Sequence, residues 1–304
     1  MPNIDTLFNI ASSNLHLLRD NGLQSQEDSD FICPICLKHF KRSDMKLLSM
    51  EDAPQASLGG KKIAVTCKKC NNTSGYQSDV HLAKYINHLE NKSNLPGTKK
   101  HVKILDNENT IRGRLEISQH NELSIILSEK DNNPTALYNH LAGVKQGTII
   151  TLEDKSLNVD WRRMTTAIIK NAYIILFARF GYSFLLDPFY DRLRKQIQHP
   201  DIPILPEALW TMQSKIHISE GVYLSNSNEY RGFFIVYSLS KLTKHNICVC
   251  IPTPLFPYEM MDEYFRQYKA GTPLHMFDCK GVNFLENLAR IRSLLKWVYG
   301  WKIL

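Results

Sequence analysis

The chain has 304 residues, of which 43% are hydrophobic and 22% are charged. These fractions are typical of a folded globular protein and exclude an intrinsically disordered chain. The length allows one large domain or two ordinary domains. A formal net charge of +7 at pH 7 favours an acidic partner. Charged residues interrupt the most apolar helical stretch, residues 165–186, so the sequence predicts no membrane-spanning segment.

The first thirty residues predict a helix and a linker. Apolar residues recur at helical spacing within residues 2–22, which indicates an amphipathic helix, and residues 24–30 form a polar linker. Residues 1–19 contain no continuous apolar core, so no signal peptide is expected. An odd number of cysteines, seven in all, together with the regular spacing of four of them, favours a reducing cytoplasm.

Two CxxC pairs follow the linker: Cys33 with Cys36, and Cys67 with Cys70. Each pair forms a tight turn that places two sulfurs on one side of an ion, and the residues between the pairs can fold back so that the ion joins both ends. Four thiolates at this spacing suit Zn²⁺, so the sequence predicts one structural zinc site. The alternative is four free buried thiols.

The residues around the second cysteine pair carry a further pattern. Residues 49–62 read SMEDAPQASLGGKK, and residues 71–79 follow the pattern NNxxGxxxD. Together with the cysteines, this stretch resembles the HNH nucleases, the zinc-clipped branch of the ββα-metal fold. The resemblance covers roughly residues 30–90. It implies a strand that ends in an acidic residue, a proline-containing loop, a Gly-Gly turn, and a helix that begins after the second CxxC pair.

The resemblance also implies three catalytic residues. Glu51 falls where the family has its acidic metal ligand, and Asn71 falls where it has an Asn or His ligand. Asp52 falls where the family has the His that deprotonates water. An unperturbed His has a pKa of about 6.5 and an Asp of about 3.9, so Asp52 is a weaker general base than the family's histidine.

Three interpretations of the Glu51–Asp52 pair stay open. In the first, the two acids and Asn71 hold Mg²⁺ or Mn²⁺, because hard cations prefer oxygen ligands. Asp52 then acts as a base, and the neighbouring Glu51 raises its pKa. The site can instead bind metal and nucleic acid without cutting. The pair can also be a solvated turn on a purely structural zinc module.

Lysines are concentrated in the same segment. Lys61 and Lys62 precede the second cysteine pair, and Lys68 and Lys69 lie inside it. A local excess of this kind is suited to contacts with phosphates, whatever the base sequence. A solvated basic face is the alternative. These four lysines are the predicted nucleic-acid-binding residues.

The rest of the chain predicts a second, larger region. A helix is expected over residues 71–89, where His81 is a further candidate base or ligand, or else an ordinary surface histidine. Residues 91–100 have the composition of a linker. After the linker, residues 111–117 and 123–127 predict a hairpin. Further strands are expected at residues 215–218, 221–224, 233–238 and 246–251. Helices are expected at residues 133–141, 161–181, 188–198, 259–268 and 284–299.

The sequence therefore predicts an α+β protein: an N-terminal helix and linker (1–30), a zinc-binding HNH-like module (31–92), and an α+β domain with a helical core and an antiparallel sheet that binds substrate or a protein partner (101–304). The predicted function is a cytoplasmic, metal-dependent endonuclease of HNH type, with structural Zn²⁺ and catalytic Mg²⁺ or Mn²⁺. Its predicted substrate is nucleic acid, with DNA favoured, and the resemblance implies bacterial phage defence. The alternative is a catalytically inactive, zinc-stabilised module that binds nucleic acid or protein.

Overall fold

Helices and antiparallel sheets alternate along the chain, which confirms the α+β class. The computed structural model describes residues 2–106, 109–146, 149–154, 158–213, 218–225, 230–260 and 276–300. The chain divides into two compact units. The first consists of residues 1–83, 160–240 and 244–304, and the second of residues 84–159 and 241–243. This grouping differs from the predicted segments, because a helix after residue 160 packs onto the N-terminal strands.

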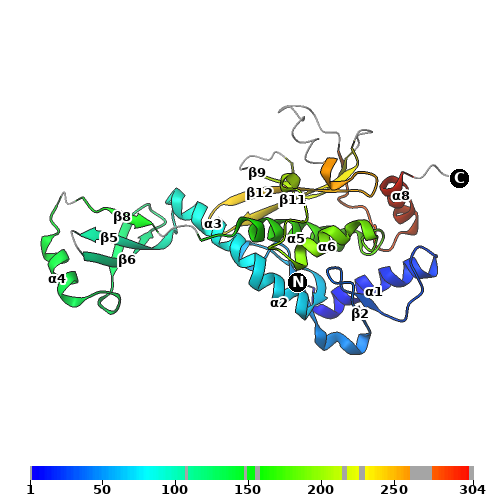
Figure 1. Ribbon diagram of the computed structural model, residues 1–304, viewed down its shortest axis with the longest axis horizontal. Coiled ribbons are helices and arrows are strands. Elements are labelled where there is room, and N and C mark those ends of the chain that lie inside the picture. The colour runs from blue at the N-terminus through cyan, green and yellow to red at the C-terminus, as the bar shows by residue number, and fades with distance from the viewer. Residues whose placement is uncertain are drawn as a thin grey trace. The chain divides into compact units, whose positions relative to one another are not determined.

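That helix is α5, Trp161–Phe180, and it is the centre of the first unit (Figure 1). It begins at the N-cap Asp160, whose side chain accepts hydrogen bonds from the backbone N–H groups of Arg162 and Arg163. Buried residues occur on all sides of α5, because it packs between the strand at residues 62–67 and a five-stranded sheet. The helix α6, Asp191–Gln198, packs beside it.

The five-stranded sheet has the strand order β13-β10-β11-β12-β9, and every neighbouring pair is antiparallel. Its apolar face packs on α5, where the rings of Phe180 and Phe233 lie with their centroids 5.4 Å apart. The final helix, α8, begins at Leu288, later than predicted, because the Asn287 side chain caps it. The strands are β9 Trp210–Gln213, β10 Gly221–Ser225, β11 Gly232–Ser240, β12 Lys244–Pro252 and β13 Met276–Asp278, and α8 spans Leu288–Tyr299.

The N-terminal part of the first unit is built from short elements. The helix α1, Ile4–Asp20, buries an apolar face that includes Phe8, Leu15 and Leu18. A two-stranded sheet, β1 Phe31–Ile32 with β2 His39–Phe40, encloses the first cysteine pair. A 3₁₀ turn at 42–47 leads into the next strand.

A hairpin and a long helix follow in ββα order. The strands β3, Leu48–Asp52, and β4, Lys62–Cys67, pair antiparallel. The helix then runs through α2, Lys68–Ser74, a π-helical turn, Gly75–Asp79, and α3, Val80–Ser93. It starts three residues before the predicted position, because Cys67 itself caps it: its Sγ accepts a hydrogen bond from the backbone N–H of Cys70. The predicted turn at 59–60 is present, with Gly59 at a φ of 84°.

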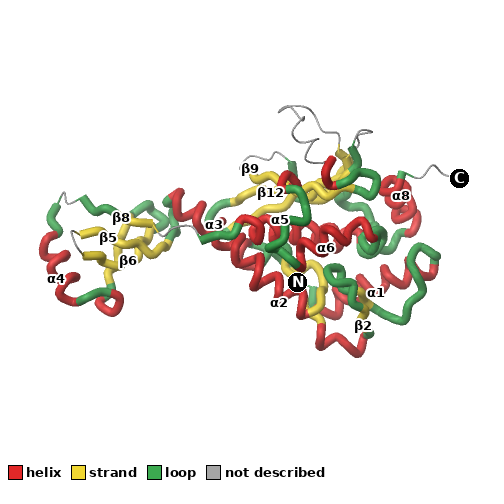
Figure 2. The backbone as a smooth tube through the Cα atoms, in the orientation of Figure 1, coloured by secondary structure: helices red, strands yellow, loops and turns green. Residues whose placement is uncertain are grey.

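The second unit contains a four-stranded antiparallel sheet of order β7-β6-β5-β8 and the helix α4 (Figure 2). Leu137 of α4 packs on Ile104 and Ile111 of the sheet, which forms the core of this unit. The predicted hairpin at 111–117 and 123–127 is present. The elements are β5 Lys99–Asp106, β6 Asn109–Ile117, β7 Leu123–Leu127, β8 Leu152–Asp154 and α4 Pro134–Gly143.

Two predicted elements lie wholly or largely outside the described residues: the strand at 215–218 and the helix at 259–268. Among the helices that the structure describes, none has the length and apolar character needed to cross a bilayer.

Candidate metal centre

The four predicted cysteines meet at one point. The ligand atoms of Cys33, Cys36, Cys67 and Cys70 all lie within 4.8 Å of one another. The Sγ atoms of Cys36 and Cys67 are 3.7 Å apart. Four sulfurs around a tetrahedral zinc, each about 2.3 Å from the ion, are roughly 3.8 Å from each other, so the spacing suits such an ion. Three of the four side chains are buried and Cys36 is partly exposed.

Local backbone structure places the sulfurs. Cys33 follows β1, and its turn closes through hydrogen bonds from Cys33 N to Lys38 O and from Leu37 N to Cys33 O, both 2.9 Å. Cys67 ends β4 and begins the helix. The backbone N–H of Cys67 donates to Cys33 Sγ, and that of Cys70 donates to Cys67 Sγ, each at 3.4 Å. These N–H···S bonds orient the sulfurs and stabilise thiolates, which is the form that binds a metal ion.

Hydrogen bonds among the four thiols shift their pKa values in opposite directions, lowering those of Cys36 and Cys67 and raising those of Cys33 and Cys70. A hydrogen bond from the Cys33 thiol is the main cause that lowers the pKa of Cys36 to about 7. Hydrogen bonds from Cys33, Cys36 and Cys70 lower the pKa of Cys67. Because their ligand atoms lie so close together, the four cysteines can hold a metal ion such as zinc. They are the one group of at least three His, Cys, Asp or Glu residues with this geometry in the described part of the chain.

The predicted acidic ligand Glu51 is buried, with 2% of its side chain exposed, and a lysine occupies its binding atoms. Lys170 of α5 donates from Nζ to Glu51 Oε1 at 2.8 Å and to Asp79 Oδ2 at 2.6 Å. Thr66 Oγ1 donates to the second carboxylate oxygen, Glu51 Oε2, at 3.1 Å. Both oxygens of Glu51 are therefore engaged by groups of the chain itself.

The two carboxylates keep the buried lysine charged. Burial lowers the pKa of Lys170, but the charges of Asp79 and Glu51 outweigh this effect and the pKa is raised. Burial and the charge of Glu51 raise the pKa of Asp79 above its ordinary value, although the charge and hydrogen bond of Lys170 lower it. The second oxygen, Asp79 Oδ1, is buried and has no hydrogen-bond partner among the described residues. The π-helical turn that ends in Asp79 packs directly against α5, and such turns are frequent at functional sites.

The other two predicted catalytic residues lie at the same hairpin. Asn71 Nδ2 donates to Ser49 Oγ and to the carbonyl of Met50, each at 3.0 Å, so this amide fastens α2 to β3. Asp52 follows a register shift in the hairpin and is partly exposed. Burial raises the pKa of Asp52, while the charge of Lys62 opposes the shift.

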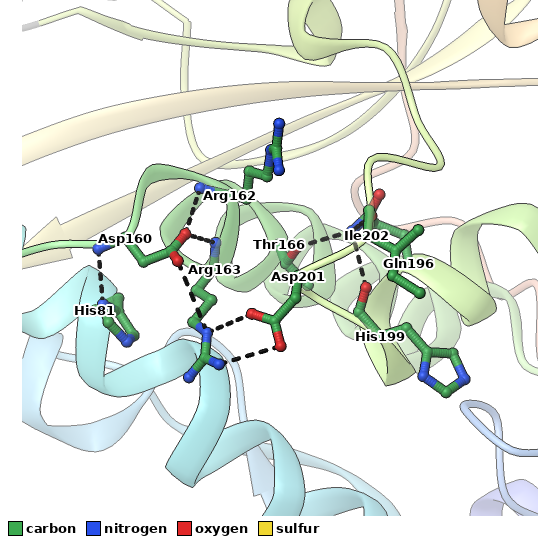
Figure 3. A network of polar contacts seen from close by, with 9 residues as sticks. All are labelled: His81, Asp160, Arg162, Arg163, Thr166, Gln196, His199, Asp201 and Ile202. Carbon is green, nitrogen blue, oxygen red and sulfur yellow. Dashed lines mark hydrogen bonds and ion pairs between the residues drawn. The ribbon is translucent and has the colours of Figure 1, made fainter.

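The candidate base His81 takes part in a helix junction. Its Nδ1 accepts a hydrogen bond of 2.9 Å from the backbone N–H of Asp160, the residue that caps α5 (Figure 3). This bond joins the start of α3 to the start of α5.

The lysines predicted to bind nucleic acid are exposed. Lys61 and Lys62 lie at the start of β4, and Lys68 and Lys69 occupy the first turn of α2. None of the four forms an ion pair with another described residue. Their ammonium groups are therefore available to an external anion.

Sequence reasoning gave Lys170 no role and considered Asp79 only as a possible helix cap. Asp79 is the last residue of the NNxxGxxxD pattern. Lys170 carried a signal, since a lysine in the middle of an apolar helix must either reach solvent or find a buried carboxylate.

Comparison of the chain with protein-family models, with curated proteins and with solved structures finds no match to any of them.

Proposed function

We propose that this protein binds nucleic acid through a metal-clipped ββα module and does not hydrolyse it. In this proposal Lys170 fills the position that a catalytic cation takes in the HNH nucleases. The observation that carries the proposal is the bridge from Lys170 Nζ to Glu51 Oε1 and Asp79 Oδ2. This is the second of the two functions that the sequence allows, and the geometry favours it over the endonuclease.

The physical reason is competition for the same oxygens. A divalent cation needs free carboxylate and carbonyl oxygens. Here an ammonium group that is covalently part of α5 already pairs with one oxygen of Glu51 and one of Asp79, and the lysine side chain is 1% exposed. A cation that displaced it would leave a buried lysine without its partners, which is strongly unfavourable. Asp52 adds a second obstacle to hydrolysis, because a carboxylate is a weaker base than the family's histidine.

Nucleic-acid binding is supported by the basic surface next to the four-cysteine cluster. The cysteine cluster fixes the end of β4 and the first turn of α2, and the exposed Lys68 and Lys69 lie in that turn. The exposed Lys61 and Lys62 lie where the same strand begins. Lysines held on rigid elements can contact successive phosphates without sequence preference. The proposed partner is accordingly a nucleic acid, with DNA favoured. A protein partner for residues 101–304 and a setting in phage defence stay predictions.

The double variant Lys68→Ala, Lys69→Ala is expected to bind DNA more weakly. Its affinity should also depend less steeply on salt concentration. Each lost phosphate contact reduces the slope of log K against log salt by about 0.9 for duplex DNA or about 0.7 for a single strand. Fluorescence anisotropy with labelled oligonucleotides between low and physiological salt measures both quantities. The matched control is the double variant Lys280→Ala, Lys296→Ala, which changes two exposed lysines elsewhere on the first unit. Equal affinity and slope in the two double variants would count against the lysine surface.

Plasmid nicking distinguishes binding from hydrolysis. We expect no Mg²⁺- or Mn²⁺-dependent nicking above the level seen with chelator, because the ammonium of Lys170 holds Glu51 and Asp79. The comparison variant is Asn71→Ala. Nicking by the wild type that needs a divalent cation and disappears in this variant would overturn the proposal in favour of the endonuclease.

A further inference from the structure

We propose that a cavity beside the first turn of α5 binds one unpaired nucleotide, with its base against tryptophan and its phosphate at Arg162. The cavity has a volume of about 380 Å³ and lies entirely within the first unit. This volume falls in the range of small-molecule sites, roughly 300–1,000 Å³. The inference goes beyond the proposed function, since the lysines contact phosphates at a different place and do not distinguish bases.

The wall of the cavity combines aromatic and aliphatic surface. Trp161 begins α5 and Trp210 begins β9, and both indoles line the same space. Trp161 is 55% exposed, although a tryptophan contributes most to stability when it is buried. Ile169, Ile202 and Leu205 complete the apolar part of the wall. The two tryptophans and these aliphatic side chains give the cavity a wall against which a base can pack.

The loop that forms one side of the cavity is fixed before any ligand binds. The buried side chain of Gln196 donates to Thr166 Oγ1 and to the carbonyl of Ile202, and its Oε1 accepts from the backbone N–H groups of Ile204 and Leu205. Asp201 in the same loop accepts from Arg163 Nε at 2.6 Å and from Arg163 Nη2 at 3.1 Å (Figure 3). A wall held in this way need not be ordered at the moment of binding, which favours affinity.

The two neighbouring arginines have different roles. Arg163 is committed to the bidentate pair with Asp201. The guanidinium of Arg162 forms no hydrogen bond or ion pair with the described residues, is exposed, and points away from the network in Figure 3. It is the single cation among the residues that line the cavity. A guanidinium with uncommitted donors matches the oxygens of a phosphate.

The remaining charged group explains why a nucleotide suits the cavity better than a simple anion. Glu207 also lines it and is exposed. Its carboxylate would repel a bare phosphate, but it can accept hydrogen bonds from an amino group on a base edge. The aromatic surface matches the ring of a base, Glu207 matches an amino group on its edge, and Arg162 matches the phosphate joined to it.

The test is titration of the full chain with each of the four nucleoside monophosphates, followed by tryptophan fluorescence and calorimetry. We expect saturable binding at one site. Trp161→Ala should weaken it by about 5- to 150-fold, the factor that one base–aromatic stack contributes. Arg162→Ala should weaken it as well, while the exposed Arg292→Ala on α8 should not. Circular dichroism confirms that these surface variants remain folded.

Three results would overturn the inference: no saturable binding by the wild type, equal binding by Trp161→Ala, or equal affinity for ribose 5-phosphate, which lacks a base. The Lys68→Ala, Lys69→Ala double variant separates this inference from the proposed function. It should bind mononucleotides like the wild type, so a failed lysine surface and a failed cavity give different results.

Discussion

Replacing Cys67 with serine should remove the bound metal and unfold the N-terminal part of the first unit. The wild type is expected to carry one Zn²⁺ per chain and the variant none. Cys67 contributes a sulfur, receives the backbone N–H of Cys70, and joins β4 to α2, so its loss affects the ion and the helix start together. We expect a loss of stability on the order of 5 kcal/mol or more, because structural zinc contributes about 10–16 kcal/mol in zinc-finger peptides.

Zinc content measured by atomic absorption and the unfolding midpoint in denaturant check this prediction. The matched control is Cys248→Ser, the same chemical change at a partly buried thiol of β12 outside the cluster. The control should keep its zinc. A Cys67→Ser protein with unchanged zinc content and midpoint would contradict a metal site at these cysteines.

Lys170→Met should destabilise the protein by about 3–5 kcal/mol, the usual result of removing one partner of a buried ion pair. Methionine fills much of the space of the lysine side chain, so the main effect is electrostatic. The change leaves Glu51 and Asp79 buried and negatively charged without the ammonium that lies 2.8 and 2.6 Å from their oxygens. Urea unfolding at pH 7.5 with saturating zinc measures the loss.

The loss of stability caused by Lys170→Met should become smaller as the pH falls. Burial raises the pKa of Asp79 even in the wild type, and without Lys170 nothing in the pair opposes that shift. The folded variant then binds more protons than the unfolded chain, so its stability is greatest at low pH and decreases as the pH rises through the raised pKa. A carboxyl with a strongly raised pKa titrates roughly between pH 5.5 and pH 8. Unfolding measurements across this range test whether the stability of the variant decreases as the pH rises.

The control for this experiment is a variant in which Lys170, Glu51 and Asp79 are all replaced by neutral residues. Adding Glu51→Gln and Asp79→Asn to Lys170→Met removes the buried charges, so the triple variant should recover stability and lose the pH dependence. A Lys170→Met protein as stable as the wild type, or one equally destabilised at every pH, would show that the bridge does not hold these elements together.

Local patterns predicted much of the fold. The helix at Trp161–Phe180, the hairpin at 111–117 and 123–127, and the three strands β10, β11 and β12 of the large sheet follow from apolar periodicity and turn residues, which act over short distances in the chain. The strands β9 and β13 of the same sheet were not predicted. Element ends were less predictable. The helix after the second cysteine pair starts at Lys68, because a cysteine sulfur serves as its cap, a role that residue propensities do not include.

By itself, the sequence determined the cysteine cluster, since two CxxC turns joined by a hairpin bring four sulfurs together whatever the rest of the chain does. Only the tertiary structure decided the state of the neighbouring acids. Lys170 lies 119 residues from Glu51 and 91 from Asp79 along the chain, and no spacing rule connects them. The packing of α5 against β4 and the π-helical turn brings the three together, and the cost of burying an unpaired charge keeps them paired.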